Sequence, residues 1–166
     1  NMNLYQTIYE RAKEIENDTV QILLELIHTP SISSKEKEVV QVVHREMEKI
    51  GFDEIRVDGL GNIIGRIGNG PKIIAFDAHL DTVSPGDLTH WSFDPFQPKV
   101  EDGKVWGLGS VDQKGGMASL LSAARIIKAL NLNDKLTVLF AGTVMEEDCD
   151  GLCWKWLVLL PRAACE

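Results

Sequence analysis

Residues 115–141 read GGMASLLSAARIIKALNLNDKLTVLFA. In the first half of this stretch, apolar side chains recur at the spacing of one helix face: Leu120, Leu121, Ala124, Ile127 and Leu130. Residues 136–141 follow a short polar break and are apolar almost throughout, as expected of a strand buried on both faces. A helix that leads directly into a buried strand indicates the α/β class.

The chain before this stretch begins with helical periodicity. Apolar residues at helical spacing start at Leu4 and continue to Ile27, which indicates one or two helices that end before Pro30. A further helix is predicted to open at Ser33, because Glu36 three residues later completes a capping box, and to stop at Gly51. Its buried positions are predicted to be Val39, Val43, Met47 and Ile50.

The period then changes from that of helices to that of strands. Three short runs rich in β-branched residues, at 55–57, 63–67 and 72–76, are separated by turns that contain glycine or asparagine, and they predict three strands. Another strand is predicted at residues 104–106. Residues 84–98 form a long irregular stretch between them, and a loop of this length is usually functional.

A histidine and an aspartate follow the strand predicted at residues 72–76. In α/β sheets, ligands bind beyond the carboxyl ends of the strands, so the residues just after each strand are candidates for function. His79 and Asp81 are two positions apart and project to the same side of an extended chain. A carboxylate can accept the ring N–H and fix the tautomer of a metal-binding imidazole. Because a His-x-Asp pair is common by chance, a loop cap or surface role is the alternative.

Carboxylates also stand near the other predicted elements. Asp112 lies beside glycines at the entrance to the helix predicted at residues 117–130, where a helix N-cap is the simpler interpretation. Glu146 and Glu147 follow the buried strand, and such a run usually marks a solvated turn. Here, however, an apolar strand delivers both acids to the edge that holds His79. Carboxylates gathered at that edge would repel one another unless a cation lay among them.

The composition excludes several functions. The formal net charge is -8 at pH 7 and no run of Lys or Arg occurs, so nucleic acid is not an expected partner. The longest apolar run, residues 156–160, is far below the roughly 20 residues that cross a bilayer, and residues 1–14 lack the apolar core of a signal peptide. We therefore expect a cytoplasmic protein without a membrane partner. The odd number of cysteines, Cys149, Cys153 and Cys165, fits reduced thiols better than disulfides.

Taken in order, three motifs resemble those of one known family. They are His79-x-Asp81, then Gly107-x-Gly109-x-x-Asp112-x-Lys114-Gly115, then Glu146-Glu147. This order is similar to that of the co-catalytic zinc metallopeptidases and amidohydrolases, which include aminoacylase, carboxypeptidase G, acetylornithine deacetylase and succinyl-diaminopimelate desuccinylase. The resemblance extends to about Trp154. It implies a three-layer α/β fold, a sheet with helices on both faces, of which this chain holds only the N-terminal part.

The resemblance also implies a role for each motif residue. Two divalent metal ions would be bound, zinc or alternatively cobalt: His79 would ligate one ion, Glu147 the other, and Asp112 would bridge both. Asp81 would orient His79, and Glu146 would be the general base that takes a proton from metal-held water as it attacks an amide carbonyl. A cis peptide bond is implied directly after Asp112. The implied substrate is a small amide or a peptide, and deacylase, desuccinylase and dipeptidase activities remain open.

The chain departs from the family's pattern at its end. Family members supply a further acidic ligand, a late histidine and an inserted smaller domain, which are not found in this sequence. We therefore divide it into a part of the catalytic domain, residues 1–154, and an atypical tail, residues 155–166, which suggests a truncated or frameshifted gene product. With one ligand missing from each ion, little or no turnover is expected. The alternative is a non-catalytic domain that binds a divalent cation weakly or serves as an interaction module. The sequence does not predict an oligomeric state.

Overall fold

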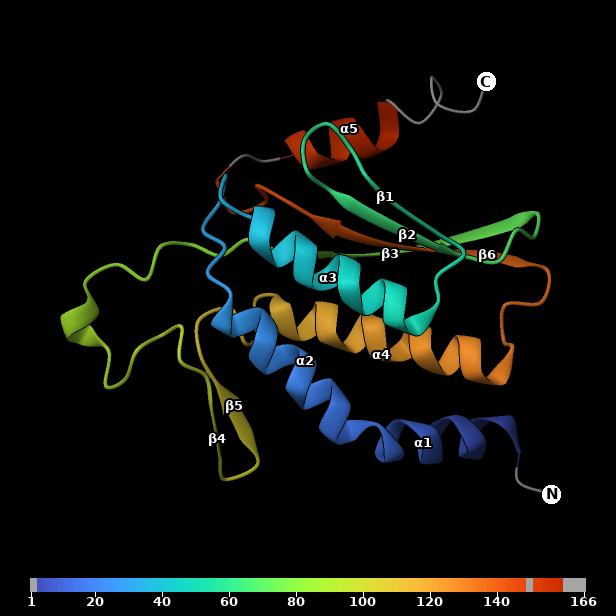
Figure 1. The fold of residues 1–166 in the computed structure, drawn as a ribbon, viewed down its shortest axis with the longest axis horizontal. Coiled ribbons are helices and arrows are strands. Elements are labelled where there is room, and N and C mark those ends of the chain that lie inside the picture. The colour runs from blue at the N-terminus through green and yellow to red at the C-terminus, as the bar shows by residue number, and fades with distance from the viewer. Residues whose placement is uncertain (1–2, 149–150, 160–166) are drawn as a thin grey trace.

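The computed structural model describes residues 3–148 and 151–159. Within them the chain forms five α-helices and six β-strands (Figure 1). The helices are α1 (Leu4–Glu14), α2 (Glu16–His28), α3 (Lys37–Ile50), α4 (Lys114–Leu130) and α5 (Leu152–Leu159). The strands are β1 (Glu54–Val57), β2 (Ile63–Ile67), β3 (Lys72–His79), β4 (Lys99–Glu101), β5 (Lys104–Trp106) and β6 (Leu136–Thr143). A short 3-10 helix, Leu88–His90, lies in the long loop between β3 and β4.

Four strands form one sheet in the order β1-β2-β6-β3. β3 and β6 are parallel, from the pair Lys72 and Leu136 to the pair His79 and Thr143, whereas β2 is antiparallel to both β1 and β6. The strand predicted at residues 136–141 corresponds to β6, which pairs with β2 on one side and with β3 on the other. α4 lies between β3 and β6 along the chain and serves as the crossover helix of this parallel pair. Both strands consequently end at the same edge of the sheet.

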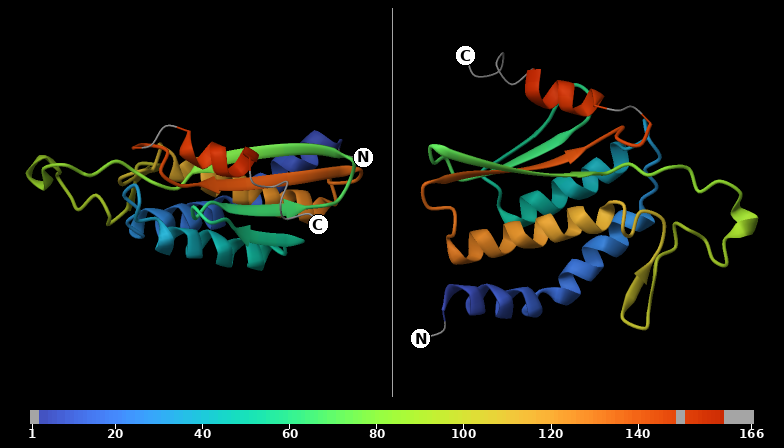
Figure 2. Two further views of the ribbon diagram at one scale, coloured as in Figure 1. Left: turned by 90° about the horizontal axis from the view of Figure 1, so that it is seen from above. Right: turned by 180° about the vertical axis from the view of Figure 1, so that it is seen from behind.

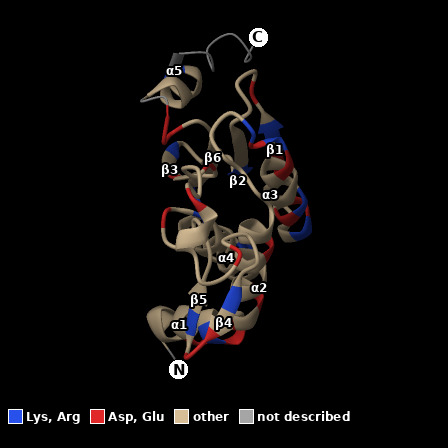
Figure 3. Cartoon of the chain, turned by 90° about the vertical axis from the view of Figure 1, so that its left-hand side faces the viewer, with Lys and Arg blue, Asp and Glu red and all other residues tan. Residues whose placement is uncertain are grey.

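Helices lie on both faces of this sheet. α3 and α4 cover one face, α1 and α2 lie outside α4, and α5 lies on the opposite side of the sheet (Figures 1 and 3). The core between the sheet and the helices includes Met47 of α3, Leu121 of α4 and Phe140 of β6. In the views of Figure 2, the loop after β3 and the β4–β5 hairpin project away from these layers. The predicted α/β fold with helices on both faces of the sheet is confirmed.

The N-terminal region confirms two predictions and contradicts one. Residues 4–28 form two helices, and α3 ends at Gly51, whose φ of 83° is a left-handed conformation that glycine adopts readily. The predicted capping box is wrong, because α3 begins at Lys37 and receives no side-chain cap. The Ser33 hydroxyl instead donates to Asp81, and the Glu36 carboxylate accepts from the nearby Ser34 N–H and from the distant Met145 N–H.

The strands follow the predicted order, but β1, β3 and β6 are longer than predicted and β4 is new. β2 and β5 have the predicted bounds, and β1 begins one residue earlier. β3 continues three residues beyond the predicted strand, since residues 77–79 pair with residues 141–143 of β6. β4 was not predicted and forms a two-stranded hairpin with β5. The extension of β3 makes His79 the last residue of a strand.

The C-terminal part of the described chain is helical. α5 crosses the domain boundary proposed between residues 154 and 155. Cys153 in this helix is a buried free thiol, whereas Cys149 and Cys165 lie outside the described residues. Among the described residues, the helices are too short or too polar to cross a membrane.

Candidate metal centre

The ends of β3 and β6 and the start of α4 meet at one edge of the sheet. His79 ends β3, Asp112 stands two residues before α4, and Glu147 stands four residues after β6. One ring nitrogen of the histidine and one oxygen of each carboxylate all lie within 4.8 Å of one another. The structure thus brings together the three residues that the sequence predicts as metal ligands.

Both ring nitrogens of the buried His79 face oxygen atoms. Nδ1 lies 3.1 Å from the main-chain oxygen of Asp81 and 3.6 Å from the carboxylate Oδ1 of the same residue. Because a carbonyl oxygen can only accept, Nδ1 carries the proton in the neutral ring. Nε2 faces Asp112 Oδ1 at 3.0 Å and Glu146 Oε2 at 3.7 Å. This tautomer presents Nε2 to the carboxylates, as a metal-binding histidine does.

The fully buried carboxylate of Asp81 holds the loop that carries both glutamates. Its Oδ2 accepts hydrogen bonds from the Ser33 hydroxyl at 2.5 Å and from the Glu147 N–H at 3.0 Å, and its Oδ1 accepts from the Glu146 N–H at 3.1 Å. Burial acts to raise the pKa of Asp81, but His79 and these donors together lower it to about 2. The sequence predicts that the Asp81 carboxylate bonds to the His79 ring. In the structure, the main-chain oxygen of Asp81 forms this hydrogen bond, and the carboxylate lies 3.6 Å away, slightly beyond hydrogen-bonding distance.

The charge of His79 makes the stability of the metal-free chain depend on pH. The negative carboxylate of Asp81 beside the ring, followed by that of Asp112 and the main-chain oxygen of Asp81, raises the pKa of His79 from 6.5 to about 9, although burial acts in the opposite direction. Between these values the folded state keeps a proton that the unfolded state has released, so stability falls as the pH rises. In the presence of a chelator, we expect the free energy of unfolding to fall by about 2 kcal/mol between about pH 6.5 and about pH 8, as measured by urea unfolding.

The variant His79→Gln is the matched control for this experiment, because glutamine does not titrate, and its stability should not fall over the same range. The range stops at about pH 8 because burial lowers the pKa of Lys114 to about 8, and release of that proton changes stability with the opposite sign. A wild-type stability that stays constant or increases between these pH values would contradict the prediction.

Asp112 lies at the end of a glycine-containing turn. Its side chain retains 74% of its accessible surface, and its peptide bond to Gln113 is cis, as the family resemblance implies. The N-cap of α4 is Gln113, so the simpler interpretation of Asp112 as the helix cap is wrong. Gly109, with a φ of 78°, lies so close to Thr82 that a Cβ at this position would be 2.8 Å from Cγ2 of the threonine. Glycine therefore allows this turn to approach the segment that follows β3.

Lys114 joins the start of α4 to the end of α2. Its ammonium group is buried and donates to the main-chain oxygens of Leu26 at 2.7 Å and Thr29 at 2.8 Å. The carbonyls at the end of a helix carry partial negative charge, which favours a cation at this place. The Lys114 N–H also donates to the Gly109 oxygen at 2.9 Å. The lysine therefore connects two helices with the turn that carries Asp112.

The two glutamates differ in exposure. The Glu146 side chain is 47% exposed, whereas Glu147 is partly buried. Burial raises the pKa of Glu147, and the negative charge of Asp112 raises it further, while His79 acts to lower it. A cation placed between Glu147 and Asp112 would replace this repulsion by attraction.

The donor set fits a divalent transition-metal ion. Imidazole nitrogen and carboxylate oxygen are both ligands of zinc, and a small number of protein ligands leaves positions for water and substrate. A pocket of about 350 Å³ adjoins the group and is lined by Trp91, Gly107, Asp112 and Glu147 among others. The site therefore combines three candidate metal ligands with space for a small molecule.

The sequence did not point to three polar residues that support this site. Ser33 donates to Asp81, Glu36 accepts from the Met145 N–H, and Asn62 accepts from the Val144 N–H. Ser33 and Glu36 do carry a signal, the S-x-x-E pattern, but that pattern is typical of a helix cap and predicts a local partner. Asn62 lies in a predicted turn, and nothing in the sequence marks it further.

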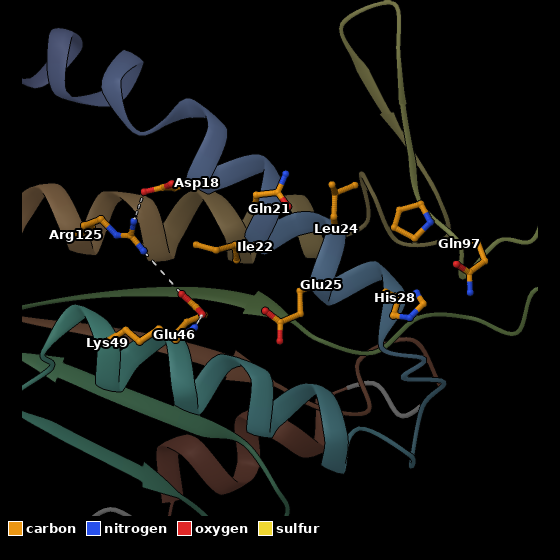
Figure 4. A pocket seen from close by; sticks show the side chains of 11 residues that line it. Asp18, Gln21, Ile22, Leu24, Glu25, His28, Glu46, Lys49, Gln97 and Arg125 are labelled. Carbon is orange, nitrogen blue, oxygen red and sulfur yellow. Dashed lines mark hydrogen bonds and ion pairs between the residues drawn. The ribbon is translucent and has the colours of Figure 1, made fainter.

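A larger cavity, of about 640 Å³, lies between α2, α3 and α4 (Figure 4). Its charged side chains are held in ion pairs: Arg125 pairs with Asp18 at 2.7 Å and approaches Glu46 at 3.8 Å, Lys49 pairs with the same glutamate, and Glu25 pairs with Arg45 outside the cavity. None of the three candidate ligands lines it. We therefore assign these charges to the packing of the helices rather than to chemistry.

Comparison with known proteins places this chain in a known family. The profile of peptidase family M20/M25/M40 matches residues 75–159. The uncharacterized protein YgeY of Escherichia coli K12 is 46% identical over 154 residues, which are 93% of this chain and 38% of YgeY. Succinyl-diaminopimelate desuccinylase of Acinetobacter baumannii ACICU is 32% identical over 133 residues, 79% of this chain and 35% of that enzyme.

A solved structure shows the same fold. The YXEP protein of Bacillus subtilis, a dinuclear metal binding peptidase from the M20 family, matches 81% of this chain and 37% of its own length, with a TM-score of 0.61 and 23% identity. This chain thus spans less than two fifths of the length of each of these three proteins.

Proposed function

Because this chain belongs to peptidase family M20/M25/M40, we propose that it provides metal-binding residues of a hydrolase that cleaves amide or peptide bonds. The observation that carries the proposal is the meeting of His79, Asp112 and Glu147 at the carboxyl ends of β3 and β6. Membership of the family supports a metal-dependent hydrolase in general terms. The individual roles and the substrate class that follow are our own assignment.

We assign two divalent metal ions to this site, zinc or alternatively cobalt. His79 would hold one ion through Nε2, Glu147 would hold the other, and Asp112 would be shared between them because its carboxylate has two oxygens. The dinuclear metal binding of the B. subtilis peptidase, which has the same fold, supports this number. Divalent ions polarise an amide carbonyl and lower the pKa of bound water.

The chain's own side chains would move the proton and fix the geometry. Glu146 is exposed and its Oε2 lies 3.7 Å from His79 Nε2, so it is placed to take a proton from water and pass it to the leaving nitrogen. Asp81 has no exposed surface, so we assign it to positioning rather than to contact with substrate. It holds the loop of the glutamates through its carboxylate and the imidazole of His79 through its main-chain oxygen.

The proposed substrates are N-acyl amino acids or short peptides. One relative is named a desuccinylase of succinyl-diaminopimelate, and the solved structure is that of a peptidase. Removal of a succinyl group from an amine and hydrolysis of a peptide both cleave an amide bond. The pocket of about 350 Å³ beside Asp112 and Glu147 suits a small substrate.

Titration with cobalt tests the metal site. We expect the chain to bind Co²⁺ with visible d–d absorption, and His79→Ala to weaken binding at least about tenfold, because loss of a ligand's supporting partner alone costs roughly 10–100-fold. His44→Ala is the matched control, since His44 lies on the surface of α3 near Glu48 and should not affect affinity. Equal affinity in His79→Ala and wild type would contradict the assignment.

Hydrolysis assays test the enzymatic part of the proposal. N-succinyl amino acids and dipeptides are incubated with the chain and added Zn²⁺ or Co²⁺, in parallel with Glu146→Gln. Metal-dependent turnover that disappears in this variant, with unchanged Co²⁺ affinity, would support Glu146 as the base. Metal binding without turnover in the wild type would instead favour a non-catalytic metal-binding domain.

A further inference from the structure

The loop that carries Glu146 and Glu147 is held by side chains rather than by sheet pairing. Each of the four consecutive N–H groups of residues 144–147 donates to a side chain from another part of the chain. The acceptors are Asn62 Oδ1 for Val144 (3.0 Å), Glu36 Oε1 for Met145 (2.9 Å), and Asp81 Oδ1 and Oδ2 for Glu146 (3.1 Å) and Glu147 (3.0 Å). Because β6 ends at Thr143, these acceptors satisfy the N–H groups that the sheet no longer pairs.

Glu36 is the acceptor whose role is not explained so far. Only 6% of this residue is exposed, and its Oε1 also accepts the Ser34 N–H at 2.9 Å. A carboxylate is costly to bury unless it is hydrogen-bonded, and an ionised acceptor forms stronger hydrogen bonds than a neutral one. α3 begins directly after Glu36 but receives no side-chain cap from it. The contact with the glutamate loop therefore accounts for this buried acid better than the helix does.

The hydrogen bond of Met145 occurs where the chain turns away from β6. Met145 has a φ of 59°, a left-handed conformation that residues with a side chain rarely adopt. Such a conformation persists only where its surroundings hold it. Immediately after this turn come Glu146 and Glu147, which face His79 and Asp112. A change in the turn would therefore change where both glutamates point.

We propose that Glu36 is a positioning residue of the candidate metal centre. By holding the N–H of Met145, it fixes the turn that presents Glu147 to His79 and Asp112. This inference rests on the proposed function, because it takes Glu147 as a metal ligand. Among the described residues, no hydrogen bond or ion pair joins Glu36 to His79 or Asp112. Its effect should therefore be confined to the glutamate side of the site.

Three variants test this role. Glu36→Ala removes the acceptor, Glu36→Gln keeps an oxygen that can replace Oε1, and Glu38→Ala is the matched control because Glu38 is exposed on α3. Hydrogen exchange of the amides of residues 145–147 and Co²⁺ affinity are measured for each. We expect Glu36→Ala to speed exchange of these amides and to weaken Co²⁺ binding by about 10–100-fold, as loss of a supporting partner of a ligand does. The other two variants should match the wild type in both measurements.

Global stability is measured alongside, so that a purely structural role can be recognised. If the Glu36→Ala variant is less stable but binds Co²⁺ with wild-type affinity, the inference is overturned. Unchanged hydrogen exchange of the Met145 amide in this variant would also overturn it. If Glu36→Ala does not fold, Glu36→Asp replaces it, because its carboxylate is one methylene too short to reach Met145 and the same loss of Co²⁺ affinity is expected.

The experiment also separates this inference from the proposed function. A wild-type chain that binds no Co²⁺ would overturn the proposed metal site, and the role of Glu36 with it. Wild-type binding that Glu36→Ala leaves unchanged would overturn the role of Glu36 alone.

Discussion

Replacing Asp81 with alanine is expected to lower the free energy of unfolding of the metal-free chain by about 3–5 kcal/mol. The carboxylate is fully buried and accepts hydrogen bonds from the Ser33 hydroxyl and from the N–H groups of Glu146 and Glu147. Alanine would leave these donors without an acceptor, and each buried donor that loses its partner costs about 1–3 kcal/mol. Urea unfolding followed by circular dichroism measures the loss.

Two further variants define how this result is interpreted. Asp134→Ala is the matched control, because Asp134 is exposed in the turn before β6 and its replacement should change stability by less than about 0.5 kcal/mol. Asp81→Asn keeps the shape and one acceptor oxygen, so its stability should lie between those of Asp81→Ala and the wild type. A loss of less than about 1 kcal/mol in Asp81→Ala would show that water replaces the carboxylate, contrary to the prediction.

Replacing Lys114 with methionine is expected to lower the free energy of unfolding by about 2–4 kcal/mol. Methionine keeps most of the apolar volume, but the main-chain oxygens of Leu26 and Thr29 would lose the ammonium group to which they are bonded. The measurement is made near pH 7, below the lowered pKa of about 8, so that the wild-type lysine is charged. Urea unfolding again provides the comparison.

Lys35→Met is the control for Lys114→Met, because Lys35 is exposed. It removes the same charge from the surface and should have little effect on stability. A Lys114→Met chain as stable as the wild type, or more stable, would mean that the cost of burying the charge exceeds the gain from its hydrogen bonds. That outcome would contradict the prediction.

The order of helices and strands could be predicted because most of them have a local periodic pattern. α4 and β6 are the clearest example, since an apolar helix face and an unbroken apolar run can be recognised without knowing their partners. The end of β3 could not be predicted. Asp77 and His79 are polar, and they become part of a strand because β6 lies beside them in register. β4 was missed for a similar reason, because Lys-Val-Glu forms a strand only against β5.

The proximity of His79 and Glu147 could be predicted from a rule about parallel sheets, whereas Asp112 follows β5, which lies outside the four-stranded sheet. Residues that follow adjacent parallel strands meet at one edge, whatever their distance along the chain. The supporting residues could not be predicted in this way. Ser33 and Glu36 bond to Asp81 and to Met145, which are 48 and 109 positions away, and such contacts leave no periodic pattern in the sequence.

The hydrogen bonds of residues 144–147 also determine which distant segments must fold together before Glu146 and Glu147 can face His79 and Asp112. They join positions separated by 65, 66, 82 and 109 residues along the chain. Closing loops of this length costs conformational entropy, which is recovered only when the distant segments have already come together. The centre therefore depends on the completed arrangement of α3, β3 and β6, and an excised piece that lacks residues 33–36 or 144–147 would not contain it. A divalent ion bound there would report on the tertiary structure of the whole segment between them.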